Sequence, residues 1–125
     1  MANRIIFATM NAHKMVEIRE ILADLPYEVV SMEEVGIEVD VVEDGKTFEE
    51  NAIKKAVEIA ALTKGDIVLA DDSGLAVDYM NGEPGIYSAR FGGRDTSYRI
   101  KNQMIIDRLK DAKEEERTAR FVCVI

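Results

Sequence analysis

Four apolar residues followed by two adjacent carboxylates constrain the fold of this chain more than any other feature of its sequence. Residues 67–70 (IVLA) are typical of a short buried strand, and Ser73 and Gly74 are expected to end it just after Asp71 and Asp72. Neighbouring strand side chains point to opposite faces, so the two aspartates are expected to have different roles. A carboxylate placed there is costly unless a metal, a cation or hydrogen bonds compensate. Two interpretations stay open: a functional site, or a turn with Asx-type hydrogen bonds.

Composition and charge limit the class of protein. A chain of 125 residues with 47% apolar and 32% charged residues has the size of one soluble domain with one core. The net charge of −8 argues against broad electrostatic binding to nucleic acid or to an anionic membrane, but not against binding a small nucleotide. The single cysteine, Cys123, favours a reducing compartment and is expected to be inert core. No signal-peptide pattern or bilayer-spanning apolar stretch occurs, so a cytoplasmic protein is expected.

A strand, a polar loop and a helix pattern follow one another at the start of the chain. Residues 4–9 (RIIFAT) predict a buried strand, and apolar residues at three- and four-residue steps from Met15 to Leu25 predict a helix that Asn11 caps. Such a loop offers backbone N–H groups and the positive end of a helix dipole to an anion. Lys14 in the first turn opposes that dipole, which favours a role in binding an anion such as phosphate. An exposed lysine on an ordinary strand–helix unit is the alternative.

The remaining elements are predicted from apolar periodicity, turn residues and helix caps. Strands are expected at residues 27–31, 37–42, 75–77 and 118–125. Helices are expected at residues 47–62, with Thr47 and Glu50 as a capping box, and after a cap within residues 95–97. Asn51 and Lys55 are four residues apart and project on one side of the first of these helices, either toward a site or into solvent. The last strand has no polar tail, which favours a truncated chain.

Three segments together resemble the inosine triphosphate pyrophosphatase family, also called dITP/XTP pyrophosphatases. Residues 9–17 (TMNAHKMVE) are similar to the family's T-G-N-x-x-K-x-x-E loop, and residues 43–52 (EDGKTFEENA) to its E-x-G-x-T-F-x-E-N-A segment. Residues 70–75 (ADDSGL) and 84–91 (PGIYSARF) resemble its A-D-D-S-G-L…P-G-x-x-S-A-R-F block. Any one motif is weak, whereas three in order at strand ends and helix starts are specific. Met10 stands where the family usually has glycine, and the family's C-terminal F-G-x-D and S-H-R segments, which hold the purine base, are not matched.

The resemblance implies an α/β fold with a mixed central sheet flanked by helices, in one domain spanning residues 1–125. This is the family's two-lobed pyrophosphatase fold with its C-terminal portion missing. The implied activity is Mg²⁺-dependent hydrolysis of non-standard purine nucleoside triphosphates (ITP, dITP, XTP) to monophosphate and pyrophosphate, by a homodimer that binds neither nucleic acid nor membrane.

The same resemblance implies roles for particular residues. Asp72 is expected to bind Mg²⁺ and to orient or deprotonate the attacking water, with Glu43 as a second carboxylate on the metal. Asp71 has a supporting role. The residues expected to hold the triphosphate are Thr9, Met10, Asn11, Ala12, His13, Lys14, Lys55 and Ser73.

Three alternatives remain open on the sequence. Related house-cleaning nucleotide pyrophosphatases open with an S-x-S-x-R-R loop, and the Thr-x-Asn-x-x-Lys pattern argues against them. A truncated, non-catalytic nucleotide-binding or interaction module of the same fold would bind a triphosphate without releasing pyrophosphate. If the chain is a plain structural α/β domain, replacing Lys14 or Asp72 would change neither nucleotide binding nor stability much.

Overall fold

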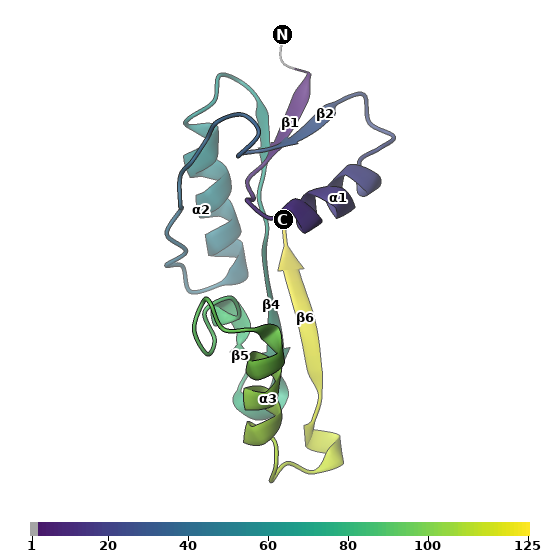
Figure 1. Cartoon of the computed structure of the whole chain (residues 1–125), viewed down its shortest axis with the longest axis vertical. Coiled ribbons are helices and arrows are strands. Elements are labelled where there is room, and N and C mark those ends of the chain that lie inside the picture. Colours follow the sequence, from purple (N-terminus) through teal and green to yellow (C-terminus); the bar gives the residue numbers. More distant parts are fainter. Residues whose placement is uncertain (1–2) are drawn as a thin grey trace. The chain divides into compact units, whose positions relative to one another are not determined.

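The structure is a computed structural model that describes residues 3–125 (Figure 1). The chain divides into two compact units. The first comprises the chain up to Asp71, together with Ile125, and the second comprises Asp72–Val124. The two adjacent aspartates therefore belong to different units. The single domain over residues 1–125 stays a prediction.

A parallel three-stranded sheet forms the centre of the first unit. β1 (Arg4–Phe7) lies between β2 (Glu28–Ser31) and β3 (Ile67–Leu69) and is parallel to both. Parallel neighbours need crossover connections, which α1 (Ala12–Ile21) supplies between β1 and β2 and α2 (Phe48–Ala60) supplies between β2 and β3 (Figure 1). The strands predicted at the start of the chain and at residues 27–31 are thereby confirmed.

β1 contributes to both hydrophobic clusters of this unit, because successive strand side chains point to opposite faces. Ile6 packs on one face in a cluster with Ile59 of α2. Ile5 and Phe7 pack on the other face in a cluster with Met15 of α1. The three apolar side chains of β1 are all buried, so this short strand holds a helix against each face of the sheet.

Side-chain caps determine where both helices begin. The Asn11 side chain accepts hydrogen bonds from two N–H groups of the first turn of α1, at 2.9 and 3.3 Å, as the sequence predicts. Thr47 Oγ1 accepts a hydrogen bond from the Glu50 N–H of α2 at 3.0 Å. In a capping box the Glu50 carboxylate would accept from the Thr47 N–H, but here it accepts from the N–H of Lys46, one residue earlier. The predicted capping box is therefore only half formed.

The strand predicted at residues 37–42 is wrong. Within the described chain these residues join neither sheet. Ile37 and Val41 pack against the cluster that contains Ile6, whereas Val39 and Val42 are exposed. The alternation of apolar and acidic residues therefore reflects one-sided packing of irregular backbone, because no neighbouring strand is present to form a ladder.

An antiparallel three-stranded sheet organises the second unit. β4 (Asp72–Val77) pairs with β5 (Glu83–Pro84) on one side and with β6 (Ala119–Val124) on the other. The helices of this unit are η1 (Asp78–Met80), η2 (Gly85–Tyr87), α3 (Tyr98–Arg108) and η3 (Glu114–Glu116). Ser97 caps α3, as one of the three predicted candidates. The α/β class, with parallel and antiparallel strands flanked by helices, is confirmed, and the strands are divided between two sheets.

Three details of the sequence prediction are corrected by the strands. Ser73 and Gly74 do not end a strand but lie inside β4, and the break falls at Ala70 and Asp71 between β3 and β4. β3 is less buried than predicted because it forms only one ladder, with β1. Cys123 is exposed rather than inert core, because β6 pairs on one side only and its side chains remain accessible.

A matched pair of substitutions on α2 tests where the core lies. Ile59 is 0% exposed and Ile53 is 59% exposed, on the same helix. We expect Ile59→Ala to lower the free energy of unfolding by about 2–5 kcal/mol, because it removes transfer energy and leaves a cavity. We expect Ile53→Ala to change it by less than about 1 kcal/mol. Urea titration followed by circular dichroism measures both, and equal losses would contradict the packing described.

Candidate functional site

The loop between β1 and α1 is shaped by its own side chains. Thr9 is buried, and its Oγ1 accepts a hydrogen bond from the Asn11 N–H at 3.1 Å. Asn11 in turn caps α1 by accepting from the N–H groups of His13 and Lys14. Several of the loop amides therefore donate within the loop. An anion at this loop would therefore meet the positive end of the α1 dipole and the Lys14 ammonium rather than a set of unpaired amides.

Met10 and its exposed neighbours, Ala12 and His13, complete the predicted loop. The Met10 side chain is 54% exposed. Within residues 3–125, Asn81 is the only non-glycine residue with a positive φ, so Met10 adopts a backbone conformation open to any L residue. The conformational freedom of a glycine is therefore not needed here. Met10 also lines a cavity of about 180 Å³ beside the first turn of α1.

Lys14 forms an ion pair with Asp71, which also belongs to the first unit. Lys14 Nζ donates to both carboxylate oxygens, at 3.0 and 3.1 Å. The Asp71 side chain is 5% exposed. A buried carboxylate requires such a partner, because an uncompensated charge in the interior is costly. This contact joins the first turn of α1 to the segment that follows β3. The supporting role of Asp71 stays a prediction.

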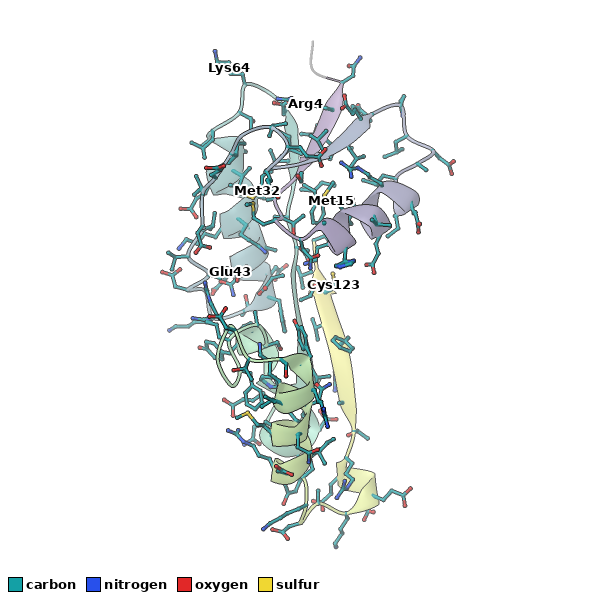
Figure 2. All side chains as sticks on the ribbon, in the orientation of Figure 1. Arg4, Met15, Met32, Glu43, Lys64 and Cys123 are labelled. Atoms are coloured by element: carbon teal, nitrogen blue, oxygen red, sulfur yellow. The ribbon has the colours of Figure 1, made fainter. Side chains whose placement is uncertain are left out.

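Residues 43–47 form a second loop that lies along the start of α2, and each of the five bonds to that helix. Glu43, which Figure 2 shows beside the N-terminal end of α2, pairs with Lys55 Nζ at 2.9 Å. The other contacts, in order, are Asp44 with Lys54, the Gly45 N–H with Asn51, the Lys46 N–H with Glu50, and Thr47 with the Glu50 N–H. The predicted metal ligand and a predicted phosphate-binding lysine are thus in direct contact.

Asn51 and Gly45 form a loop contact that the sequence analysis did not assign: it left Asn51 open between a site and solvent, and it gave Gly45 no role. Asn51 is 0% exposed, and Lys55 is partly buried, so neither is the solvated surface residue that the alternative interpretation expected. The signal that could have found them is the spacing of E-x-G-x-T-F-x-E-N-A. Its glycine and its asparagine stand where a loop amide meets the first turn of the helix that follows.

The contact between Asp44 and Lys54 shifts the pKa values of both side chains. The hydrogen bond from the Lys54 ammonium, at 2.7 Å, holds the pKa of the Asp44 carboxyl below its ordinary value of 3.8. The same contact raises the pKa of Lys54 above its ordinary value of 10.5. Both shifts favour the charged forms, so the contact is maintained throughout the neutral range.

Asp72 and Ser73 lie at the start of β4, in the second unit. Asp72 is buried and Ser73 is exposed, as expected for neighbours on opposite faces of a strand. Ser88 braces this segment: its Oγ accepts from the Leu75 N–H at 2.9 Å and donates to the Gly85 carbonyl at 2.6 Å. The catalytic and phosphate-binding roles given to Asp72 and Ser73 stay predictions.

The oxygen chemistry of the predicted metal ligands suits magnesium. No group of three or more His, Cys, Asp or Glu side chains in residues 3–125 is arranged to hold a metal ion. Mg²⁺ does not need such a group, because it usually keeps several waters and takes one or two carboxylates together with substrate phosphates. The carboxylates of Glu43, which is partly buried, and of Asp72 fit that requirement in kind.

Comparison with known proteins identifies the family. The Ham1 family model matches residues 5–125. A dITP/XTP pyrophosphatase of Clostridium perfringens is 53% identical over an alignment of 127 residues, and the match covers 98% of this chain and 62% of that protein. Another, from Leuconostoc mesenteroides, is 48% identical and covers 98% of this chain and 61% of that protein. The solved structure of a HAM1 protein from Coxiella burnetii is 37% identical, with a TM-score of 0.87 over 99% of this chain and 61% of that chain.

The fold is therefore the α/β fold of the Ham1 proteins, and the chain belongs to the Ham1 family. The resemblance to the dITP/XTP pyrophosphatases is confirmed, since the relatives carry that name. The chain spans about three fifths of the length of the curated relatives it matches, 62% and 61% in the two cases. None of the helices in its described part has the length and apolar character needed to cross a membrane.

A double-mutant cycle tests the Lys14–Asp71 pair. We expect Lys14→Met and Asp71→Asn each to lower the free energy of unfolding by about 1–3 kcal/mol, because each removes a charged hydrogen bond from a partly buried site. The double variant should lose less than the sum, with a coupling energy of about 0.5–3 kcal/mol, because the pair can be lost only once. Urea unfolding measures all four proteins, and strictly additive losses would contradict the contact.

The stabilisation that the Asp44–Lys54 contact contributes is expected to be lost at low pH. Because the pKa of Asp44 is lowered in the folded state, its stabilisation is present above the ordinary value of 3.8 and is lost as the pH falls through the lower folded value. We expect Lys54→Met to raise the NMR titration midpoint of the Asp44 carboxyl toward 3.8. Lys64→Met is the control that leaves the midpoint unchanged, and a shift of equal size there would argue against the contact.

Proposed function

We propose that this chain forms the phosphate- and metal-binding part of a Mg²⁺-dependent pyrophosphatase for non-standard purine nucleoside triphosphates. The observation that carries the proposal is the placement of two lysines, Lys14 at the start of α1 and Lys55 on α2, each held on a carboxylate that belongs to a family motif. The names of the relatives supply the substrate class: dITP and XTP. ITP belongs to the same class by its hypoxanthine base.

The loop of residues 9–14 and the two lysines bind and orient the triphosphate in this proposal. The positive end of the α1 dipole and the Lys14 ammonium attract phosphate oxygens. Lys55 reaches the same phosphates, and Ser73 donates a hydrogen bond from its hydroxyl. Because a triphosphate is a polyanion, cations already held in position by Asp71 and Glu43 bind it at a smaller cost in side-chain entropy.

Asp72 and Glu43 are the proposed ligands of Mg²⁺, which when bound neutralises phosphate charge and makes water more acidic. Asp72 accepts a proton from the attacking water. The oxygen of that water bonds to the α phosphorus, and pyrophosphate leaves with the bridging oxygen. The products are a nucleoside monophosphate and pyrophosphate. Positioning and charge neutralisation account for most catalysis in this kind of reaction.

Several finer features belong to the same proposal. The homodimer and the cytoplasmic location follow from the family resemblance and from the composition, and they remain expectations. The proposed reaction requires no binding partner other than a small nucleotide. Size-exclusion chromatography with light scattering gives the oligomeric state directly.

Pyrophosphate release from dITP in the presence of Mg²⁺ tests the function. We expect release that depends on the metal, and a loss of at least about 100-fold in Asp72→Asn, because general-base catalysis typically contributes about 10²–10⁴. Asp78→Asn is the matched control in the same unit, since Asp78 contacts Thr118 and Arg120 outside the proposed site. dATP is the control substrate.

The negative outcomes separate the alternatives. If the protein binds a non-hydrolysable dITP analogue but releases no pyrophosphate, it is a nucleotide-binding module of the same fold. If Lys14→Ala and Asp72→Asn alter neither nucleotide binding nor stability, the plain structural domain is the correct description.

A further inference from the structure

A buried amide side chain underlies the loop that carries Glu43. Asn51 is in the first turn of α2 and is 0% exposed, and its Oδ1 accepts the Gly45 N–H at 2.7 Å. Burying a carboxamide is costly unless its polar atoms are hydrogen-bonded. Within residues 3–125, no buried side-chain nitrogen or oxygen lacks a partner. The amide therefore serves as a connector between helix and loop, where an apolar side chain would only fill space.

Gly45 is required at this contact for space rather than for backbone freedom. A Cβ at this position would lie 2.7 Å from Asn51 Oδ1 and 2.8 Å from the Glu50 Cβ, both closer than real Cβ contacts. Gly45 is not among the described glycines with positive φ. The loop backbone thus approaches α2 as closely as a glycine permits, and at that point the Asn51 side chain accepts the Gly45 N–H.

This contact differs from the others along the loop in its exposure to solvent. Asp44, Lys46, Thr47 and Glu50 are all exposed, where water competes with ion pairs and hydrogen bonds. The Glu43–Lys55 ion pair is only partly buried, and it holds the carboxylate rather than the loop backbone. The Asn51–Gly45 hydrogen bond is the contact whose side chain is fully buried, two residues from Glu43. It is therefore the contact best able to fix the position of the Glu43 backbone.

We propose that Asn51, acting through Gly45, is a positioning residue that sets the Glu43 carboxylate for a divalent cation. The inference rests on the proposed function, which assigns Glu43 to the ion. Residues that orient metal ligands commonly change metal affinity by about 10–100-fold when they are replaced. Asn51 itself touches neither substrate nor metal in this scheme, so its replacement weakens cation binding without removing a ligand.

The test measures Mn²⁺ binding by the intact chain, from the electron paramagnetic resonance signal of free Mn²⁺, with and without α,β-imido-dITP. We expect Asn51→Ala and Gly45→Ala each to weaken Mn²⁺ binding about 10-fold. They break the same contact from its two sides, so Gly45→Ala supplies the comparison if Asn51→Ala fails to fold. Thermal unfolding and circular dichroism establish which variants are folded.

Thr47→Ala is the matched control. It removes the cap of α2 and lowers stability, but it leaves the Asn51–Gly45 contact in place. We expect it to bind Mn²⁺ as the original chain does. Equal weakening in Thr47→Ala, or unchanged binding in a folded Gly45→Ala, overturns the proposal.

Comparing the Mg²⁺ dependence of activity with kcat at saturating Mg²⁺ distinguishes a positioning role from a catalytic one. In Asn51→Ala we expect the Mg²⁺ concentration for half-maximal pyrophosphate release to rise about 10-fold, while kcat recovers at saturating Mg²⁺. A kcat that stays low at saturating Mg²⁺ contradicts the role. Glu43→Gln distinguishes failure of the proposed metal ligand from failure of the positioning role. If this variant binds Mn²⁺ unchanged, the assignment of Glu43 to the ion fails, whatever the Asn51 variants do.

Discussion

The burial of β1 between two parallel strands and two helices is the constraint on which the first unit depends. Ile6 belongs to the cluster on the α2 face, and Ile5 and Phe7 belong to the one on the α1 face. Because a single four-residue strand contributes to both clusters, neither helix can shift without disturbing the core of the other. The loops that leave this sheet therefore begin from rigid positions, as a binding site requires.

Charge pairing holds two lysines of the first unit in place. Lys14 and Lys55 each contact a carboxylate, so the side chains are ordered while their charge is locally balanced. A phosphate that reaches them competes with a protein carboxylate, which moderates affinity and favours a ligand carrying several charges.

The parts of the structure that could be predicted are those that depend on local chemistry. Asn11, Thr47 and Ser97 cap helices because their side-chain oxygens meet nearby N–H groups, and neighbouring residues suffice to recognise this. The family motifs likewise located the loops that hold Lys14 and Glu43, while the roles assigned to those residues await experiment.

What could not be predicted depends on partners distant in sequence. The segment at residues 37–42 has the pattern of a strand but no neighbour to pair with, whereas Ser73 and Gly74 are drawn into β4 because β6 pairs with them. Cys123 has apolar neighbours in sequence yet lies on an exposed strand. Pattern alone does not reveal which segments will find a partner, so these errors share one cause.

The five contacts between residues 43–47 and α2 make loop and helix a single structural piece. The partners Glu50, Asn51, Lys54 and Lys55 occupy two adjacent turns of the helix. One residue added between Asn51 and Lys54 would swing both lysines about 100° around the helix axis, while the amide stayed in place. An insertion or deletion in either segment would break contacts with the other, so grafting this acidic loop onto another scaffold requires the start of its helix as well.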